Sequence, residues 1–223
     1  PSPTVNFKGI DSGISCPPKT VQFTDLSNPN IPSNVSYYCV FGDGNTSTLQ
    51  NPSHTYTLVG SYNVTLVVTN ASGCQKSLTK AAYIQLVEAP DANFDSPNPT
   101  ACGAPGTITF NNTSTNATSY LWNFGDNTTS VATNPSHTYN APGTYTVTLI
   151  ATNAAGCTDT MVRTAYVTIV DVHSAFTPSA FTVCAGVSVS FTNNSTNATS
   201  YNWNFGDNTT STATNPIHSY NTA

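Results

Sequence analysis

The chain has 223 residues, of which 7% are charged, and its formal net charge is −5. Because it has five Lys and Arg residues in total, it lacks the cationic surface that nucleic-acid binding requires, and that function class is excluded. No run of about 18 apolar residues occurs, so no membrane span is expected.

Alternating apolar and polar residues predict β-strands along the whole chain. In one such strand, Tyr62, Val64, Leu66 and Val68 alternate against Asn63 and Thr65. Later runs of the same kind cover residues 107–110, 120–124, 143–152 and 165–170. Gly, Pro, Asn and Asp gather between these runs, as in turns, and no amphipathic helix is visible. The pattern predicts an all-β chain of small β-sandwiches.

The chain repeats itself with a period of about 82 residues. Phe-Gly-Asp begins at Phe41, Phe124 and Phe205, and a Tyr follows each Phe after 15 residues. Between residues 110–140 and 191–221, 25 of 31 positions are identical. Repetition at a fixed period is typical of tandem modules.

The period divides the chain into three domains, called repeats one to three below. Repeat one covers residues 1–88, repeat two 89–171 and repeat three 172–223. Repeat three has no equivalent of residues 143–170, so its last strands are missing and we expect a piece of a longer array. The alternative is donor-strand assembly, in which a neighbouring molecule supplies the missing strands.

The recurring motif Trp-Asn-Phe-Gly-Asp is interpreted as a structural motif of the fold. Trp122 and Phe124 lie two residues apart, so both point into the core from one strand, and Asp126 can accept hydrogen bonds from the following turn. The alternative is a ligand site built on Asp126. The structural signature residues are Cys39, Phe41, Asp43 and His54 in repeat one; Trp122, Phe124, Asp126 and His137 in repeat two; and Trp203, Phe205, Asp207 and His218 in repeat three.

These motifs, with Asn134-Pro-Ser-His-Thr-Tyr139 and the strand that begins at Pro142-Gly-Thr-Tyr, resemble the PKD (polycystic kidney disease) domain family. The resemblance covers repeats one and two and the present part of repeat three; repeat one departs from it at Cys39, where the family has Trp. It implies tandem immunoglobulin-like β-sandwiches in an elongated array, usually extracellular. It also implies contacts with proteins or carbohydrates, or a spacer role in surface proteins and secreted hydrolases, and no catalytic residues or cofactor.

The cysteines recur at two positions of the repeat. Cys16, Cys102 and Cys184 hold the first position, before an early strand, and Cys74 and Cys157 hold the second, in the hairpin after the long strand. The pairs expected within each repeat are Cys16–Cys74 and Cys102–Cys157, with Cys184 unpaired. Metal ligation is the alternative, although no CxxC motif occurs. Cys39 replaces a core Trp and is expected to be a buried free thiol. Disulfides place the chain outside the cytosol.

Few residues suit catalysis. Each repeat has one dependable carboxylate, whereas a glycosidase needs a facing pair. His54 and His137 follow Ser53 and Ser136, but the third copy has Ile217 in that place, so a structural histidine is favoured over a Ser-His-Asp triad. Asp91 and Asp95, near a domain junction, are the candidates for calcium ligands. Tyr37, Tyr38, Tyr120 and Tyr201 are the candidates for stacking on sugar rings.

The sequence is rich in Asn-x-Ser/Thr sequons, which are either glycosylation sites or plain polar surface. They begin at Asn34, Asn45, Asn63, Asn70, Asn111, Asn112, Asn116, Asn127, Asn193, Asn194, Asn197 and Asn208. Thr160 lies in an Asp-Thr-Met sequence that resembles a bacterial O-glycosylation site.

The favoured function is a non-catalytic structural and adhesive repeat protein at the cell surface, a stalk or filament of stiff modules. Its expected partners are other copies of itself or neighbouring repeats, and surface glycans or proteins. The alternative is a set of accessory carbohydrate- or protein-binding spacer modules of a secreted hydrolase.

Overall fold

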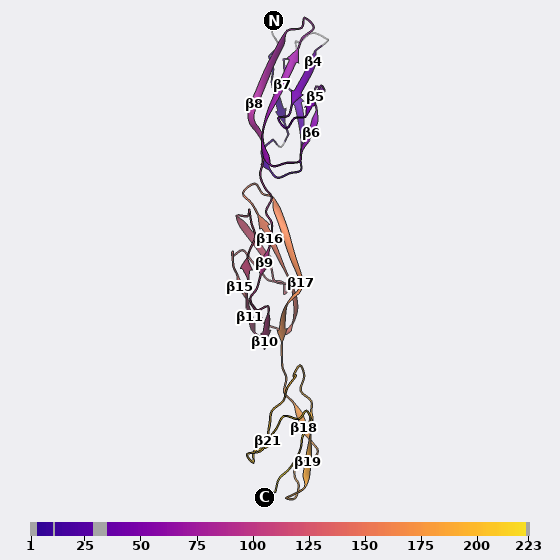
Figure 1. The fold of residues 1–223 in the computed structure, drawn as a ribbon, viewed down its shortest axis with the longest axis vertical. Helices are drawn as coiled ribbons and strands as arrows, with labels where there is room; N and C mark the ends of the chain where they lie inside the picture. Colours follow the sequence, from indigo (N-terminus) through magenta and orange to yellow (C-terminus); the bar gives the residue numbers. More distant parts are fainter. Residues whose placement is uncertain (1–3, 11, 29–34, 222–223) are drawn as a thin grey trace. The chain divides into compact units, whose positions relative to one another are not determined.

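A computed structural model describes residues 4–10, 12–28 and 35–221. These residues form strands and turns, and none of them belongs to a helix of the length and apolar character that a membrane span needs. The expected all-β class is therefore confirmed (Figure 1).

The chain divides into two units. One contains residues 1–94, 112–121 and 149–161, and the other contains residues 95–111, 122–148 and 162–223. The division runs through repeat two, so that one end of this repeat belongs to the same unit as repeat one.

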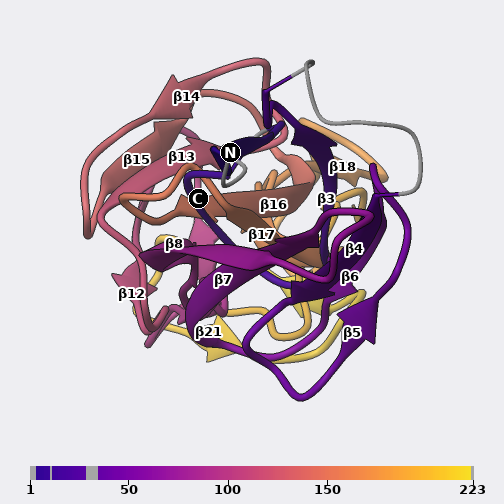
Figure 2. The same ribbon diagram turned by 90° about the horizontal axis from the view of Figure 1, so that it is seen from above.

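Repeat one is a sandwich of two sheets. Its strands are β1 (Phe7–Gly9), β2 (Ile14–Ser15), β3 (Lys19–Asp25), β4 (Ser36–Val40), β5 (Thr46–Ser47), β6 (Ser53–Tyr56), β7 (Gly60–Thr69) and β8 (Gln75–Leu86). One sheet has the order β1-β3-β6 and the other β2-β8-β7-β4-β5. The long hairpin β7–β8 is the largest element, and Figures 1 and 2 show its two strands side by side.

Strand β2 is paired in an unusual direction for this sheet. It runs parallel to β8, with Ile14 opposite Gln85 and Ser15 opposite Leu86, whereas β7 and β4 pair antiparallel to their neighbours. This pairing places Cys16 beside the last residues of β8.

Repeat two uses the same plan. Its strands are β9 (Phe94–Asp95), β10 (Thr100–Cys102), β11 (Gly106–Thr109), β12 (Asn111–Asn112), β13 (Ser119–Asn123), β14 (Thr129–Ser130), β15 (Ser136–Tyr139), β16 (Gly143–Thr152) and β17 (Thr158–Val170). The main sheet has the order β10-β17-β16-β13-β14, and β11-β15 and β12-β9 form two smaller sheets. Strand β10 is parallel to β17, with Cys102 opposite Val170.

Repeat three contains β18 (Phe176–Pro178), β19 (Ser188–Asn193), β20 (Trp203–Asn204), β21 (Thr210–Ser211) and β22 (Ile217–Ser219). These strands form the sheets β18-β19-β22 and β20-β21. Its aromatic rings pack on one another, with centroid distances of 5.3 Å for Phe176–Trp203 and 5.4 Å for Phe191–Phe205.

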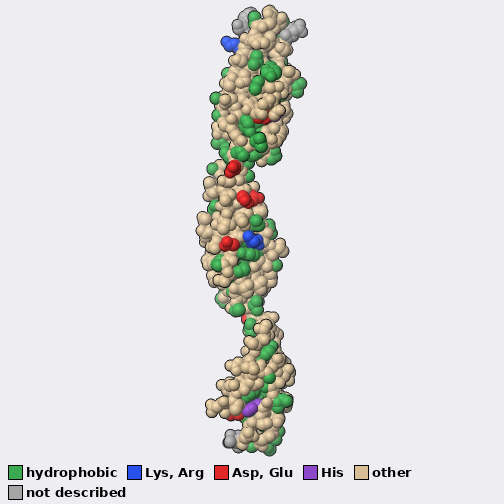
Figure 3. Space-filling model, in the orientation of Figure 1, with side chains coloured by type: hydrophobic (Ala, Val, Ile, Leu, Met, Phe, Trp, Pro, Cys, Tyr) green, Lys and Arg blue, Asp and Glu red, His purple; other side chains and the backbone are tan. Residues whose placement is uncertain are grey.

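The surface is dominated by uncharged polar groups. On the face that Figure 3 shows, acidic and basic side chains are few and scattered. This agrees with the 7% of charged residues and with the hydroxyl and amide side chains that fill the outward strand positions.

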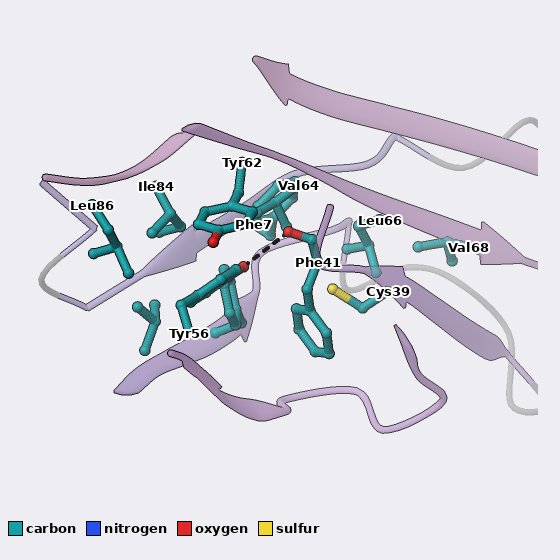
Figure 4. Close-up of a cluster of buried hydrophobic side chains, with 12 residues drawn as sticks. Phe7, Cys39, Phe41, Tyr56, Tyr62, Val64, Leu66, Val68, Ile84 and Leu86 are labelled. Carbon is teal, nitrogen blue, oxygen red and sulfur yellow. Dashed lines mark hydrogen bonds between the residues drawn. The ribbon is translucent and has the colours of Figure 1, made fainter. Parts of the chain in front are cut away.

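The core follows from strand alternation. In β7, the side chains of Tyr62, Val64, Leu66 and Val68 are buried and lie with Cys39 of the neighbouring strand β4 and with Phe41, which follows that strand (Figure 4). In repeat two the equivalent alternation buries Val147, Leu149 and Ala151, and Trp122 and Phe124 are 0% and 2% exposed. The exposed fractions of these two rings match the inward direction that the spacing predicted.

Candidate functional site

The residue types most capable of chemistry meet at one turn in every repeat. This turn, called the Asp–His turn below, joins the strand before it (β4, β13 or β20) to a short strand (β5, β14 or β21), and its Asp contacts the histidine of the strand after that (β6, β15 or β22). In repeat two the carboxylate Asp126 Oδ2 lies 2.7 Å from His137 Nε2. The same atoms lie 2.7 Å apart in His54–Asp43 and in His218–Asp207.

The second oxygen of each carboxylate closes the turn. Asp126 Oδ1 accepts hydrogen bonds from the backbone N–H of Thr128 at 3.1 Å and from its hydroxyl. Asp207 is bonded to Thr209 in the same way, and in repeat one Asp43 Oδ1 accepts from the N–H of Asn45 at 3.0 Å. The carboxylate therefore has its acceptor sites occupied by the turn and the histidine together.

The histidine ring is held on both sides by aromatic rings. His137 stacks on Phe124 with centroids 4.1 Å apart and planes 4° apart, and meets Tyr139 edge-on at 4.6 Å. The Tyr139 hydroxyl then donates to the carbonyl of Phe124 at 3.1 Å. Repeat one has the same arrangement, in which the Tyr56 hydroxyl donates to Phe41 O at 3.1 Å (Figure 4).

A glycine makes room for the turn in repeats one and two. Gly125 has φ of +85°, a conformation that L side chains rarely adopt, and an added Cβ would collide with the carbonyl oxygen of Thr146. Gly42 has φ of +89° and faces Asn63 O in the same way.

Partial burial would raise the pKa of Asp43 and Asp126, but hydrogen bonds outweigh it and leave both pKa values below the ordinary value for Asp. For Asp43 the donors are His54 and Asn45, and for Asp126 they are Thr128 and His137. Hydrogen bonds from Thr209 and His218 lower the pKa of Asp207 to about 2. The three carboxylates are thus held in the ionised form.

The serines beside these histidines do not join them. Ser53 and His54 are neighbours in β6, and Ser136 and His137 are neighbours in β15, so each pair points to opposite faces of its sheet. Since a nucleophile must lie within hydrogen-bond reach of its base, this placement argues against a Ser-His-Asp triad.

Asp91 and Asp95, the two candidate calcium ligands, do not belong to a cluster of metal-binding side chains among the described residues. The backbone of Asp91 is bridged to Thr115, and the Asp95 carboxylate accepts from Asn111 Nδ2 at 3.0 Å. Among the residues that the structure describes, no group of three or more His, Cys, Asp or Glu is placed to hold a metal ion.

The four tyrosines that are candidates for stacking on sugar rings differ in exposure. Tyr38 is 46% exposed, whereas Tyr37 packs against the core of repeat one, and Tyr120 and Tyr201 are half-buried. Burial, with a smaller contribution from the nearby Asp25, raises the pKa of the Tyr37 hydroxyl.

Several sequon side chains are already used by the fold. Asn63 Oδ1 accepts from Ala82 N–H at 2.7 Å, Asn111 donates to Asp95, and Asn116 Nδ2 donates to Glu88 Oε2 at 2.9 Å. Asn34 lies outside the described residues, and Thr160 lies in β17. Glycosylation of the sequons stays a prediction.

The expected disulfides, Cys16–Cys74 and Cys102–Cys157, are wrong in this structure. The bond joins Cys16 to Cys157, whose Cα atoms are 6.3 Å apart, and Cys74, Cys102 and Cys184 are free and exposed. Cys16 lies beside the end of β8, whereas Cys74 lies at its start. A 12-residue strand is about 40 Å long, far beyond the Cα separation that a disulfide spans.

The same geometry rules out the second expected pair. Cys102 lies opposite Val170 at the end of β17, and Cys157 precedes Thr158 at its start. First- and second-position cysteines therefore lie at opposite ends of a module, and a first-position cysteine can meet the second-position cysteine of the next one. The parallel pairing of the early strand with the last strand determines this, and cysteine spacing alone does not reveal that pairing.

Asn153 lies beside the Cys16–Cys157 disulfide, at the contact between repeats one and two, which is called the junction below. Its Nδ2 donates to the carbonyl of Glu88 at 2.9 Å and lies 3.4 Å from Cys16 Sγ. Its Oδ1 accepts from the N–H groups of Ala155 and Cys157, both at 3.0 Å. Asn153 is 9% exposed, so a polar side chain is buried with its hydrogen bonds formed.

Cys39 forms no disulfide bond. It is 3% exposed and free, and burial raises the pKa of its thiol to about 11. The thiol stays protonated and serves as a small apolar side chain in the place that Trp122 takes in repeat two.

The PKD domain model matches residues 2–86, 87–169 and 174–223. The chain belongs to the PKD domain family. The resemblance on which the signature residues were interpreted is therefore confirmed, and the modules are immunoglobulin-like β-sandwiches in tandem.

Curated relatives include two collagenases of Bacillus cereus. Collagenase ColA is 58% identical over 38 residues, which is 17% of this chain and 4% of the relative. Collagenase ColQ1, from strain Q1, is 42% identical over 73 residues, which is 32% of this chain and 7% of the relative. The chain thus spans a small part of either collagenase.

Solved structures with similar sequences are also PKD domains. The PKD1 domain of the Vibrio cholerae metalloprotease PrtV is 31% identical, with a TM-score of 0.31, and the match covers 38% of this chain and 96% of that one. The PKD1 domain of Vibrio anguillarum Epp is 32% identical, with a TM-score of 0.32, over 37% and 98%. PKD domains of this kind are non-catalytic accessory modules, and this family and the disulfide both indicate an extracellular protein.

Proposed function

We propose that these PKD domains form a segment of a cell-surface stalk or filament, which holds other parts of the protein away from the cell and makes contacts with proteins or glycans. The observation that supports this most is the bond between Cys16 and Cys157, because it ties successive repeats covalently. A tie between modules limits how far a chain extends under tension, which is a property that a stalk needs and a catalytic domain does not.

The Asp–His turns support a non-catalytic role. In each repeat the carboxylate bonds to the histidine and to the residue two positions after it (Asn45, Thr128 or Thr209), and the histidine lies against aromatic rings of the same module. A carboxylate that acts as a general base must accept a proton from a substrate, whereas both oxygens of each of these carboxylates accept hydrogen bonds within their own module.

The proposal is tested by the dimensions of the chain in solution. The long strands have 10–13 residues, or roughly 33–43 Å, so three modules end to end reach on the order of 100 Å and a radius of gyration near 30 Å. A compact chain of this length has a radius of gyration of about 17 Å. Small-angle X-ray scattering decides between them, and the smaller value would contradict a stalk.

A second candidate is an accessory binding module of a secreted hydrolase. Two of the relatives are collagenases, which favours this alternative. Sedimentation of the purified chain with insoluble collagen and with insoluble polysaccharides tests it. Saturable binding to one of these polymers would favour the accessory role, and its absence from all of them favours the stalk.

A further inference from the structure

The hairpin that carries Cys74 has the same construction as the hairpin that carries Cys157. In repeat two the segment Asn153–Cys157 is closed by the N–H of Asn153 donating to Cys157 O at 3.0 Å and that of Gly156 donating to Asn153 O at 3.0 Å. In repeat one the N–H of Asn70 donates to Cys74 O at 3.0 Å and that of Gly73 to Asn70 O at 2.9 Å. The two hairpins thus have one backbone conformation.

The asparagine side chains have the same internal role but different outer partners. Asn70 Oδ1 accepts from Ser72 and Cys74 N–H groups, as Asn153 Oδ1 accepts from those of Ala155 and Cys157. Asn153 Nδ2 in addition donates across the junction to Glu88 O. Among the described part of the chain, Asn70 Nδ2 has no acceptor, and the Cys74 thiol is free and exposed.

The chain also contains free first-position cysteines, which are equivalent to the Cys16 that bonds to Cys157. Cys102 is the last residue of β10 and has the register that Cys16 has directly after β2, because Ala101 lies opposite Ile169 as Ser15 lies opposite Leu86. Cys102 is exposed and free, and so is Cys184, the first-position cysteine of repeat three.

We propose that the hairpin Asn70–Cys74 is a docking and disulfide-forming site, and that it takes the first-position cysteine strand of a second copy of this chain. The evidence is the equivalent hairpin of the same molecule, which is bonded to Cys16 in this manner. The contact joins two different surfaces, so it adds copies head to tail. This inference deepens the proposed function by naming the partner and the bond.

The bond forms by thiol–disulfide exchange with a small disulfide, for example oxidised glutathione. The Cys74 thiolate attacks one sulfur of that disulfide and releases a glutathione thiolate. The Cys102 or Cys184 thiolate of the second copy then attacks Cys74 Sγ in the mixed disulfide and releases the second glutathione thiolate. Two electrons pass from the protein thiols to the small disulfide, and each protein thiol loses its proton to solvent.

The test incubates the purified full chain in a glutathione redox buffer and separates the products without reductant. Covalent dimers and longer multimers are expected, and peptide mapping by mass spectrometry should find Cys74 joined to Cys102 or Cys184. The variant C74S and the double variant C102S/C184S should both reduce multimers to background, whereas C39S should leave them unchanged. The docking contact is tested by N70D, which keeps the Oδ1 acceptor and loses the Nδ2 donor, and should slow multimer formation more than it slows the reaction of Cys74 with glutathione.

Three results would overturn the proposal: a product that stays monomeric, multimers that survive C74S, or a symmetric Cys74–Cys74 bond as the main linkage. These results are independent of the scattering measurement above, because the dimensions of a single chain are measured under conditions that keep Cys74 reduced or replaced by Ser.

Discussion

The histidine of each repeat has three neighbours that hold it. His137 is bonded to Asp126, stacked on Phe124 and in edge contact with Tyr139. The Tyr139 hydroxyl donates to the carbonyl of Phe124, so that the end of β13, the Asp–His turn and β15 are connected through side chains. We infer that these residues recur in every module because they close the fold.

Low pH should reduce the stability that the Asp–His turns contribute to the fold. Since the pKa of Asp207 is about 2 when folded and near 3.9 when unfolded, its stabilising effect is present above pH 4 and is lost as the pH falls toward 2. The pKa values of Asp43 and Asp126 are lowered as well, so they act in the same direction. We expect the melting temperature to fall less steeply between pH 4 and pH 2 in D43N/D126N/D207N than in the wild type. Equal slopes would show that the turns contribute nothing through ionisation.

Gly125 and Gly206 offer a matched pair of substitutions. Both have φ of +85°, so replacement by Ala costs about 1–2 kcal/mol in backbone strain at either site. At Gly125 the new Cβ also meets Thr146 O, whereas at Gly206 nothing lies within 4 Å among the described residues. G125A should therefore destabilise repeat two more than G206A destabilises repeat three, as measured by hydrogen exchange of each module. Equal effects would show that the close approach at Thr146 is relieved without cost.

At the scale of the element, the long strand β7 shows how alternation builds the core. Tyr62, Val64, Leu66 and Val68 are buried in the cluster that contains Cys39 and Phe41, and the alternate positions of the strand are less buried. Replacing Leu66, which is 3% exposed, by Ala should lower the free energy of unfolding of repeat one by about 2–5 kcal/mol.

The matched control is Leu58, which is 71% exposed. L58A should change the stability by about 0.5 kcal/mol or less, because no packed contact is lost. Urea unfolding of both variants measures the difference. A similar loss in both would place the core of repeat one elsewhere.

The strands, the repeat and the inward direction of the signature aromatics could be predicted from the sequence, because they depend on local alternation. The role of His137, the partner of Asp126, could be predicted from the sequence only in part. The sequence indicated a structural histidine, but its stacking on Phe124 requires β13 and β15 to be placed in space. The disulfide could not be assigned from spacing, since Cys16 and Cys74 are at opposite ends of β8 and only the parallel pairing of β2 reveals it.

At the scale of the whole molecule, the cysteine positions make the repeat a unit that can be joined. Each complete module has a first-position cysteine at the end of its last strand and a second-position cysteine at the opposite hairpin. A series of complete modules would place such a pair of cysteines at every junction, in the way that Cys16 and Cys157 join repeats one and two, and the stalk proposed above requires this.

The most direct test of this account stretches a single chain by its two ends, before and after reduction. With Cys16 bonded to Cys157, residues 17–156 cannot extend, and reduction should release roughly 480 Å of additional length in the unfolded chain. Pairs within the repeats, Cys16–Cys74 and Cys102–Cys157, would instead release two segments of roughly 200 Å each. Release of the single long segment is the result that we predict, and two short segments, or no change on reduction, would contradict the account.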